Sequence, residues 1–368
     1  MNLAVAFGRR RLPSTSRSPS AGLLPSAWFG ALMLVLIAFG IVSMVIGVGI
    51  GSVRVPAATV VEVIWAKSLG SSDSAAASNL VQIVWDLRFP RVVLAALVGA
   101  GLSVVGVAVQ ALVRNPIADP YVLGVSSGAS IGAAVVIVYG SAMGLGALGL
   151  SGAAFATACL SMAVVYVVAR RGGGLNPLRL VLTGVVAGYV LSALTSYLVF
   201  QGNPRGAQQV LFWLLGSFGR ARWSALLIPA IVLALVLVWL IARARAMDAL
   251  LAGDEAAITF GVPVARVRLE LFAATAALTA VMVAVSGAVG FVGLVVPHIV
   301  RLLVGGLHRR VLMASALFGA VFMVWVDLAA RTLASPQEIP VGILTAIIGG
   351  PVFLFLMSRR DSRTDQLR

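Results

Sequence analysis

Few side chains in this chain of 368 residues could carry out chemistry: twelve carboxylates, two histidines and one cysteine. Only two acids, Glu270 and Asp327, fall inside long apolar stretches, each near an end. Arg266 or Arg268 can neutralise Glu270. Arg331 follows Asp327 by four residues, the spacing of an ion pair on a helix surface. A relay of buried acids, which a proton-coupled carrier would need, is therefore not predicted.

The remaining reactive groups indicate no metal or nucleotide site. His298 and His308 have no third ligand nearby in the sequence, so we expect structural hydrogen bonds from them. Cys159 lies in an apolar stretch and is expected to be a small buried hydrophobe. The P-loop pattern is absent, because the only lysine, Lys67, is not preceded by glycine. We expect no cofactor on this chain, and if it pumps a substrate, the energy must come from another chain or from an ion gradient.

The composition indicates an integral membrane protein. Hydrophobic residues make up 60% of the chain and charged residues only 11%, whereas soluble domains carry about 25% charged residues. The net charge of +15 could suggest a nucleic-acid partner. The basic residues are scattered between apolar stretches, however, so the predicted partner is membrane lipid and not nucleic acid.

The elements that must position the charged residues are apolar segments long enough to cross a bilayer. We predict an all-α polytopic bundle of about ten transmembrane helices. The segments are Ala27–Gly51, Val92–Val113, Gly124–Tyr139, Leu150–Val168, Leu178–Phe200, Ser224–Ala242, Val267–Val285, Gly290–Leu303, Val311–Ala329 and Ile339–Met357. The third and eighth are short and bounded by glycine, which is tolerated only where neighbouring protein covers the backbone.

The arginines orient this bundle. With the N-terminus inside, 19 of the 27 basic residues face the cytoplasm, which fits the positive-inside rule. Both termini are then cytoplasmic. We divide the chain into a disordered N-terminal tail (1–26), a permease domain (27–360) and a C-terminal tail (361–368).

The largest predicted cytoplasmic loop, residues 243–268, has the features of a docking element. It is expected to form two short helices, with Gly253 ending the first. Asp254 and Glu255 stand at the N-terminus of the second, where the helix dipole favours acids, and Gly261 can adopt the left-handed C-cap. An ordinary amphipathic loop lying on the lipid headgroups is the alternative.

Eight sequence blocks in order resemble the FecCD-type family of iron-chelate and cobalamin uptake permeases of ABC importers. The blocks are RFPR (88–91), NPIADP (115–120), GVSSGA (124–129), FWLLGSF (212–218), GDEAAITFGV (253–262), GFVGLVVPHIVR (290–301), DLAAR (327–331) and PVGILTAIIGGPVF (340–353). The resemblance implies a type II ABC importer permease in the inner membrane. It would work as a dimer, with a second copy or a similar chain, and with two ATP-binding cassette subunits. A substrate-binding protein would deliver the chelate outside.

The resemblance also implies roles for individual residues. Outward arginines of this family pair with glutamates of the binding protein, and Arg88, Arg91 and Arg331 match them. Interfacial arginines that only anchor the helices are the alternative. On the inner side, the resemblance places Gly253, Asp254, Glu255 and Gly261 in a cleft of the ATPase.

The inner gate and the pathway follow from the same resemblance. Residues 115–117 (Asn115, Pro116 and Ile117) match one gate loop. Pro177 and Leu178 match the other, although they are bulkier than the small hydroxyl residues of some members. Tyr197, Phe200 and Gln201, near the outer end of the fifth segment, are candidates for lining the pathway, and simple packing is an equal alternative.

Ferric-siderophore import is the expected activity, with cobalamin and haem as close alternatives. The choice rests on family frequency, because no sharp recognition motif for a cargo is present. A secondary carrier without ATP is a distant alternative, and an unpaired structural membrane protein is more distant still.

Overall fold

The computed structural model describes residues 25–51, 53–70, 77–140, 147–170 and 175–364, and side chains for all of these except 147–148 and 356–364. Within these ranges the chain forms helices and connections without strands, as predicted. The helices are α1 (Ser26–Gly49), α2 (Ala57–Ser68), α3 (Ser78–Val81), η1 (Gln82–Arg88), α4 (Phe89–Val113), η2 (Pro120–Leu123), α5 (Val125–Tyr139), α6 (Ala147–Ala169), α7 (Pro177–Gln201), α8 (Pro204–Leu214), η3 (Trp223–Ala225), α9 (Leu227–Leu251), α10 (Asp254–Thr259), α11 (Val264–Ser286), α12 (Val292–Val304), α13 (His308–Thr332) and α14 (Val341–Thr364).

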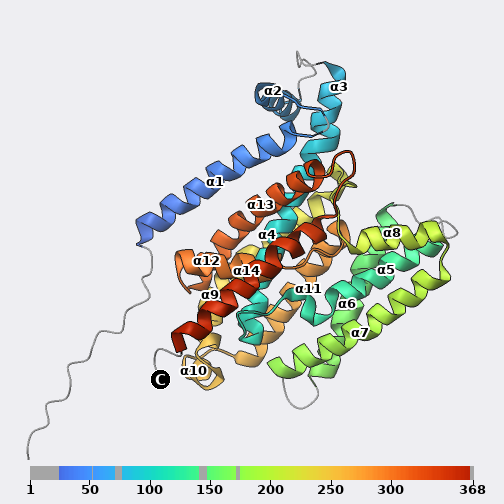
Figure 1. Ribbon diagram of the computed structural model, residues 1–368. Coiled ribbons are helices and arrows are strands. Elements are labelled where there is room, and N and C mark those ends of the chain that lie inside the picture. Colours follow the sequence, from blue (N-terminus) through green and yellow to red (C-terminus); the bar gives the residue numbers. More distant parts are fainter. Residues whose placement is uncertain (1–24, 52, 71–76, 141–146, 171–174, 365–368) are drawn as a thin grey trace, which may run out of the picture.

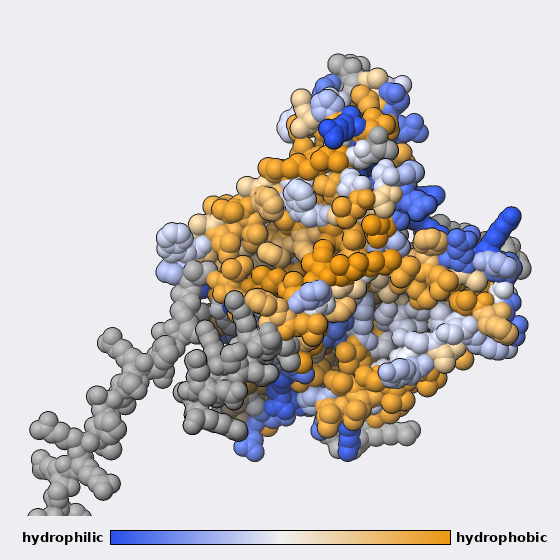
Figure 2. All heavy atoms as spheres, in the orientation of Figure 1, coloured by the Kyte–Doolittle hydropathy of each residue, from blue (hydrophilic) through white to orange (hydrophobic). Residues whose placement is uncertain are grey.

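Seven of these helical stretches are long and apolar enough to cross a membrane. Three shorter apolar helices, α5, α12 and the described part of α14, coincide with the other predicted segments. Figure 2 shows hydrophobic residues over the middle of one face, with hydrophilic residues gathered toward its ends. The chain is a multi-pass membrane protein.

Helix α4 is the centre of the bundle. In its most apolar window 83% of the residues are buried, against 17% in α1 and in α7. It packs against α13, α11, α12 and α9 (Figure 1). A Cβ atom on Gly99 of α4 would overlap the carbonyl oxygen of Gly319 on α13, so only glycine permits this approach. Small residues at such contacts let helices pack closely in a membrane, where water does not drive association.

Helices α5, α6 and α7 form a second group beside this centre, with α8 resting against α5 (Figure 1). Helices α2 and α3 lie at one end of the molecule, and α10 lies at the opposite end near the C-terminus. Charged sites at α10 and at the start of α4 are therefore held at opposite ends of one rigid centre.

Two predicted boundaries were wrong. The second segment begins well before Val92, because α3, η1 and α4 form one continuous helical stretch over residues 78–113. Pro90 lies just after η1, a π-helical turn, where the regular pattern of α-helical hydrogen bonds is already interrupted. The sixth segment does not end at Ala242, since α9 continues to Leu251. Residues 243–251 hold strong helix formers and no breaker, so the expected first short helix is an extension of α9.

The predicted tails lie largely outside the described residues. Of the N-terminal tail (1–26), only Pro25 and Ser26 are described, and Ser26 already begins α1. At the other end α14 runs to Thr364, past the expected start of the C-terminal tail at residue 361.

An aromatic cluster joins the start of the central stretch to the start of α9. The rings of Trp85 and Trp223 have centroids 4.6 Å apart, and Phe89 packs against both. The Trp223 Nε1–H donates a hydrogen bond to the Trp85 carbonyl at 2.9 Å. The cluster fixes η3 against η1, at the end of the molecule opposite α10.

Candidate functional site

Helix α10 is a short projecting element between two glycine turns. Gly253 precedes it at φ 105° and ψ 162°, a region that essentially only glycine occupies. Gly261 follows it at φ 76°, the left-handed conformation predicted for its C-cap. Asp254 and Glu255 occupy the first turn, as predicted. The sequence therefore places both acids and both turns correctly.

The two neighbouring acids of α10 face different surroundings. Asp254 Oδ1 lies 2.7 Å from Arg268 Nη2 on α11 and 3.2 Å from Arg114 Nη1 at the end of α4. Arg268 is buried and also donates through Nη1 to the Leu175 carbonyl oxygen at 3.3 Å. The Glu255 side chain is exposed. Asp254 thus points into the chain and Glu255 points away from it.

The first predicted gate turn begins directly at this ion pair. Arg114 ends α4 in the left-handed conformation. The Asn115 side-chain oxygen then accepts a hydrogen bond from the Ile117 N–H at 3.1 Å, which closes a tight turn around Pro116. Asn115 is exposed, whereas Pro116 and Ile117 are half-buried.

The second predicted gate turn is capped in a similar way. The Asn176 side-chain oxygen accepts hydrogen bonds from the N–H groups of Leu178 and Arg179 and so begins α7. Pro177 is half-buried, and the Leu178 side chain is exposed. Both turns are thus rigid, and each is attached to Asp254 through one arginine.

The connection between α4 and α5 is anchored beyond the first turn. The Tyr121 hydroxyl bonds with both the carbonyl oxygen and the N–H of Val289, at 2.8 and 2.7 Å. Burial raises the pKa of Asp119, although hydrogen bonds from the backbone of Tyr121 and Phe291 oppose the shift. Burial and the Asp119 charge raise the pKa of the Tyr121 phenol. These contacts fix the connection against the segment between α11 and α12.

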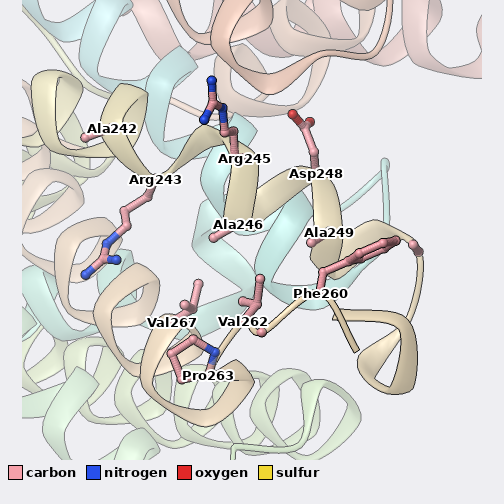
Figure 3. A pocket seen from close by; sticks show the side chains of 12 residues that line it. Ala242, Arg243, Arg245, Ala246, Asp248, Ala249, Phe260, Val262, Pro263 and Val267 are labelled. Atoms are coloured by element: carbon pink, nitrogen blue, oxygen red, sulfur yellow. The ribbon is translucent and has the colours of Figure 1, made fainter. Parts of the chain in front are cut away.

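An open hollow of about 610 Å³ lies beside α10. Figure 3 shows Ala246 and Ala249 of α9 on one side of it and Val262, Pro263 and Val267 on the other. Arg243, at its edge, forms an ion pair with Glu270 at 2.9 Å. The lining combines apolar side chains with the charged Arg243, Arg245 and Asp248, which suits a side chain of another protein.

The histidine and acid near this hollow are structural. The Asp248 carboxylate accepts a hydrogen bond from the His308 N–H at 3.0 Å and lies 2.6 Å from His308 Nδ1. Glu270 also pairs with Arg266, one of the two partners expected for it, at 2.9 Å. Among the described residues, no group of three His, Cys, Asp or Glu side chains could hold a metal ion.

The opposite end carries a charged cluster that we call the outer cluster: Arg91, Asp327, Arg331 and Glu338. Asp327 is wholly buried, 2.9 Å from Arg91 Nε and 3.0 Å from Arg331 Nε. The Asp327–Arg331 pair is the one predicted from their spacing. Glu338 holds Arg91 through two parallel contacts, at 2.9 and 3.0 Å. Arg91 and Arg331 keep part of their surface exposed.

Arg88 is placed differently from these residues. It is only 8% exposed and donates to the carbonyl oxygens of Val48, Gly49 and Val53 at 2.6 to 3.2 Å. These carbonyls belong to the end of α1 and the residues after it. The guanidinium therefore bonds to carbonyl oxygens of its own chain, and the docking role of Arg88 stays a prediction.

The predicted pathway residues share one exposed face of α7. Tyr197 and Phe200 are exposed, and the Gln201 side-chain amide donates to the Tyr197 hydroxyl at 2.7 Å. Neither of the two charged sites contacts this face. The structure thus separates the predicted residues into three places: the α10 end, the outer cluster and the α7 face.

Sequence reasoning missed Arg114, Arg268 and Leu175 as part of the α10 site, and Glu338 as part of the outer cluster. Arg114 stands directly before the gate motif, which was a usable signal. The pairing of Arg268 with Asp254 and Leu175 depends on how α11 packs, and no local spacing reveals it.

Comparison with known proteins matches this geometry to a family. The model of the FecCD transport family matches residues 35–359. The cobalamin import system permease protein of Halobacterium salinarum is 43% identical over 283 residues, which is 76% of this chain and 74% of that protein. The hemin transport system permease protein of Yersinia pestis is 36% identical over 313 residues, covering 81% and 93% of the two chains.

A solved structure agrees with these sequence relatives. It shows the inward-facing conformation of a transporter assigned to the metal-chelate type of ABC transporter. The TM-score is 0.78 and the identity 30%, with 90% of this chain and 99% of that one covered. The eight sequence blocks, the helical bundle and these matches agree, and the chain belongs to the FecCD transport family.

Proposed function

We propose that this chain is the membrane permease of an ATP-driven importer of ferric siderophores in the bacterial inner membrane, with both termini cytoplasmic. The chain would carry no cofactor, and ATP and Mg²⁺ would be bound by separate ATPase subunits. Cobalamin and haem are the alternative cargoes, because the relatives named above import different ones. The structural likeness to a metal-chelate type transporter fits all three cargoes, because each is a metal chelate, so the choice of the siderophore rests on family frequency.

The observation that carries the proposal is the projecting helix α10. Its outer surface presents the exposed Glu255 and Ile258, and the exposed Phe260 directly after it lines the hollow. Exposed aromatic and aliphatic groups next to a hollow and a carboxylate are the usual components of a protein interface. We assign this surface to the ATPase, with Gly253 and Gly261 shaping the turns on either side.

At the opposite end, Arg91 and Arg331 are the proposed docking site for an extracytoplasmic substrate-binding protein. Only 11% of the Arg91 side chain and 7% of the Arg331 side chain is exposed, and an acidic partner would add to the carboxylates already present. Charge pairing of this kind governs orientation and association rate more than affinity. Arg88 and Arg331 both donate to carbonyl oxygens at the end of α1, so Arg91 is the strongest candidate of the three predicted docking residues.

The exposed face of α7 is proposed to meet a second permease chain, either another copy or a similar protein. Tyr197, Phe200 and Gln201 would then line the pathway between the two chains. Only 17% of the apolar window of α7 is buried within this chain. The turns at Asn115–Ile117 and Pro177–Leu178 would close the inner end of that pathway.

Uptake by living cells tests the cargo and the energy source together. The gene is deleted, and uptake of labelled ferric siderophore, haem and cobalamin is compared with and without the restored gene. Loss of siderophore uptake alone is expected. Loss of haem or cobalamin uptake instead would change the cargo and keep the mechanism.

A second arm addresses the energy source. Uptake is measured after an uncoupler and, separately, after ATP depletion at maintained membrane potential. We expect uptake to follow ATP. Uptake that persists without ATP and stops with the uncoupler would indicate a secondary carrier and contradict the proposal.

A further inference from the structure

We propose that the Asp254 carboxylate is a positioning group that joins α10 to both inner turns, residues 114–117 and 175–178. A displacement of α10 by the ATPase would then move the two turns together. This inference rests on the proposed function and specifies how the α10 site would act on the gate.

The geometry places one oxygen atom at the junction. Asp254 Oδ1 lies 3.2 Å from Arg114 Nη1 and 2.7 Å from Arg268 Nη2. Arg268 connects Asp254 to the second turn, because its Nη1 donates a hydrogen bond to the Leu175 carbonyl oxygen at 3.3 Å. Arg114 connects Asp254 to the first turn directly, because the Arg114 backbone itself forms the end of α4 and the start of that turn.

The two halves of the junction differ in strength. The Arg268 side chain is only 9% exposed, so its charge-assisted bond to Asp254, which is 38% exposed, is shielded from water on the arginine side. The Arg114 side chain is 36% exposed, and exposed pairs are weaker because solvent screens them. A push on α10 would therefore be transmitted more firmly to the second turn than to the first.

Helix α10 is also built to move as a unit. The residues on either side of it, Gly253 and Gly261, have positive φ angles with open space where a Cβ would be. Ala257 is the only residue of α10 buried against the rest of the described chain. Asp254 is thus the main polar attachment of an otherwise lightly held helix.

The test compares the two neighbouring acids, Asp254→Asn and Glu255→Gln, each of which loses one negative charge from the same helical turn. Tagged permease is purified from the native membrane, and the co-purifying ATPase and its ATP hydrolysis are measured beside uptake of the cargo that the wild type imports. For Asp254→Asn we expect ATPase association and hydrolysis to persist while uptake falls about tenfold, within the usual range of coupling between sites. For Glu255→Gln we expect association and uptake to fall together.

A cysteine in the first gate turn shows whether Asp254 carries movement of α10 to the gate or only stabilises the fold. Asn115→Cys is introduced on a Cys159→Ala background, and its rate of maleimide labelling is measured with and without ATP. With Asp254 present the rate should depend on nucleotide. In the Asp254→Asn variant the labelling rate should no longer depend on nucleotide. If Asp254 only stabilises the fold, the labelling rate of this variant will still respond to ATP.

Arg114→Gln keeps the test valid if Asp254→Asn does not reach the membrane. Because it removes only the weaker half of the junction, we expect a partial loss of uptake. In combination with Asp254→Asn it should add nothing, as expected for residues acting through one contact. Arg309→Gln, an exposed arginine at the start of α13, is the matched control and should transport normally.

The outcomes distinguish the inference from the proposed function. If wild-type uptake does not require an associated ATPase, the proposed function fails. If wild-type uptake requires ATP but Asp254→Asn transports normally, the inference alone fails. It also fails if Asp254→Asn loses the ATPase in the same proportion as Glu255→Gln, since Asp254 would then be an ATPase contact.

Discussion

At the scale of single residues, the fully buried Asp327 is the acid that the fold depends on most. It faces Arg91 of α4 and Arg331 of α13. Neutralising it in Asp327→Asn leaves two arginines short of a counter-charge, although Arg91 keeps Glu338. We expect the free energy of unfolding to fall by about 3 kcal/mol, the lower end of the range for removing one partner of a buried ion pair.

Denaturant titration of the purified protein in detergent measures this loss. Asp86→Asn is the control, because Asp86 is exposed on the same helical stretch and should change stability little. Equal effects of the two substitutions would show that total charge, and not the Asp327 contact, stabilises this end of the molecule.

Glu338 supports a second prediction in the same cluster. It occupies Arg91 with both oxygens while remaining half-exposed, so it resembles the carboxylate that a docking partner would offer. Glu338→Gln should leave stability nearly unchanged, since exposed pairs contribute about 0–1 kcal/mol. It should raise the association rate of the native binding protein, most clearly at low salt.

Biolayer interferometry with the permease in nanodiscs measures that rate. Asp86→Asn again removes one acid without touching Arg91. An equal rise in both variants would mean that only the overall field changed, and a fall in Glu338→Gln would mean that Glu338 itself belongs to the docking surface.

Sequence alone predicted the residue contacts that are local. The Asp327–Arg331 and Arg266–Glu270 pairs follow from a spacing of four residues on a helix. The contact of Arg91 with Asp327 spans 236 positions, and the burial of Arg88 depends on carbonyls at the end of α1. Such contacts depend on how helices pack, which spacing within one helix does not encode.

At the scale of elements, the approach of α4 to α13 is one of the closest helix contacts in the described bundle. A side chain at Gly99 would overlap the Gly319 backbone, so Gly99→Val must separate the two helices. We expect a loss of about 1–3 kcal/mol from overpacking, seen as a lower denaturation midpoint.

Gly30→Val is the matched substitution in α1, where nothing lies within 4 Å of the added Cβ atom. It should have little effect on the midpoint. If both variants have the same denaturation midpoint, the close contact between α4 and α13 does not contribute to stability, contrary to the structure.

The elements themselves were predictable where apolar length decides them. All ten predicted segments correspond to helices, because a bilayer requires long apolar stretches. The extension of α9 to Leu251 and the start of the central stretch at Ser78 were missed. Polar residues continue both helices beyond the apolar part, so hydropathy cannot locate their ends.

At the scale of the whole molecule, the orientation in the membrane is the main prediction. Single cysteines at exposed positions, Ser78→Cys near α3 and Glu255→Cys on α10, are introduced on a Cys159→Ala background. A membrane-impermeant maleimide should label Ser78→Cys in intact spheroplasts and Glu255→Cys only in inverted vesicles. The reverse pattern would invert the proposed topology and with it both docking assignments.

The aromatic contact between Trp85 and Trp223 gives the molecule an optical signal of its own. Two indoles 4.6 Å apart, inclined by 36°, couple their excited states and should produce a paired band in circular dichroism. Trp85 lies on the same helical stretch as Arg91, and Trp223 lies in η3. Events at that end could therefore be followed spectroscopically in the unmodified chain, without attaching a dye.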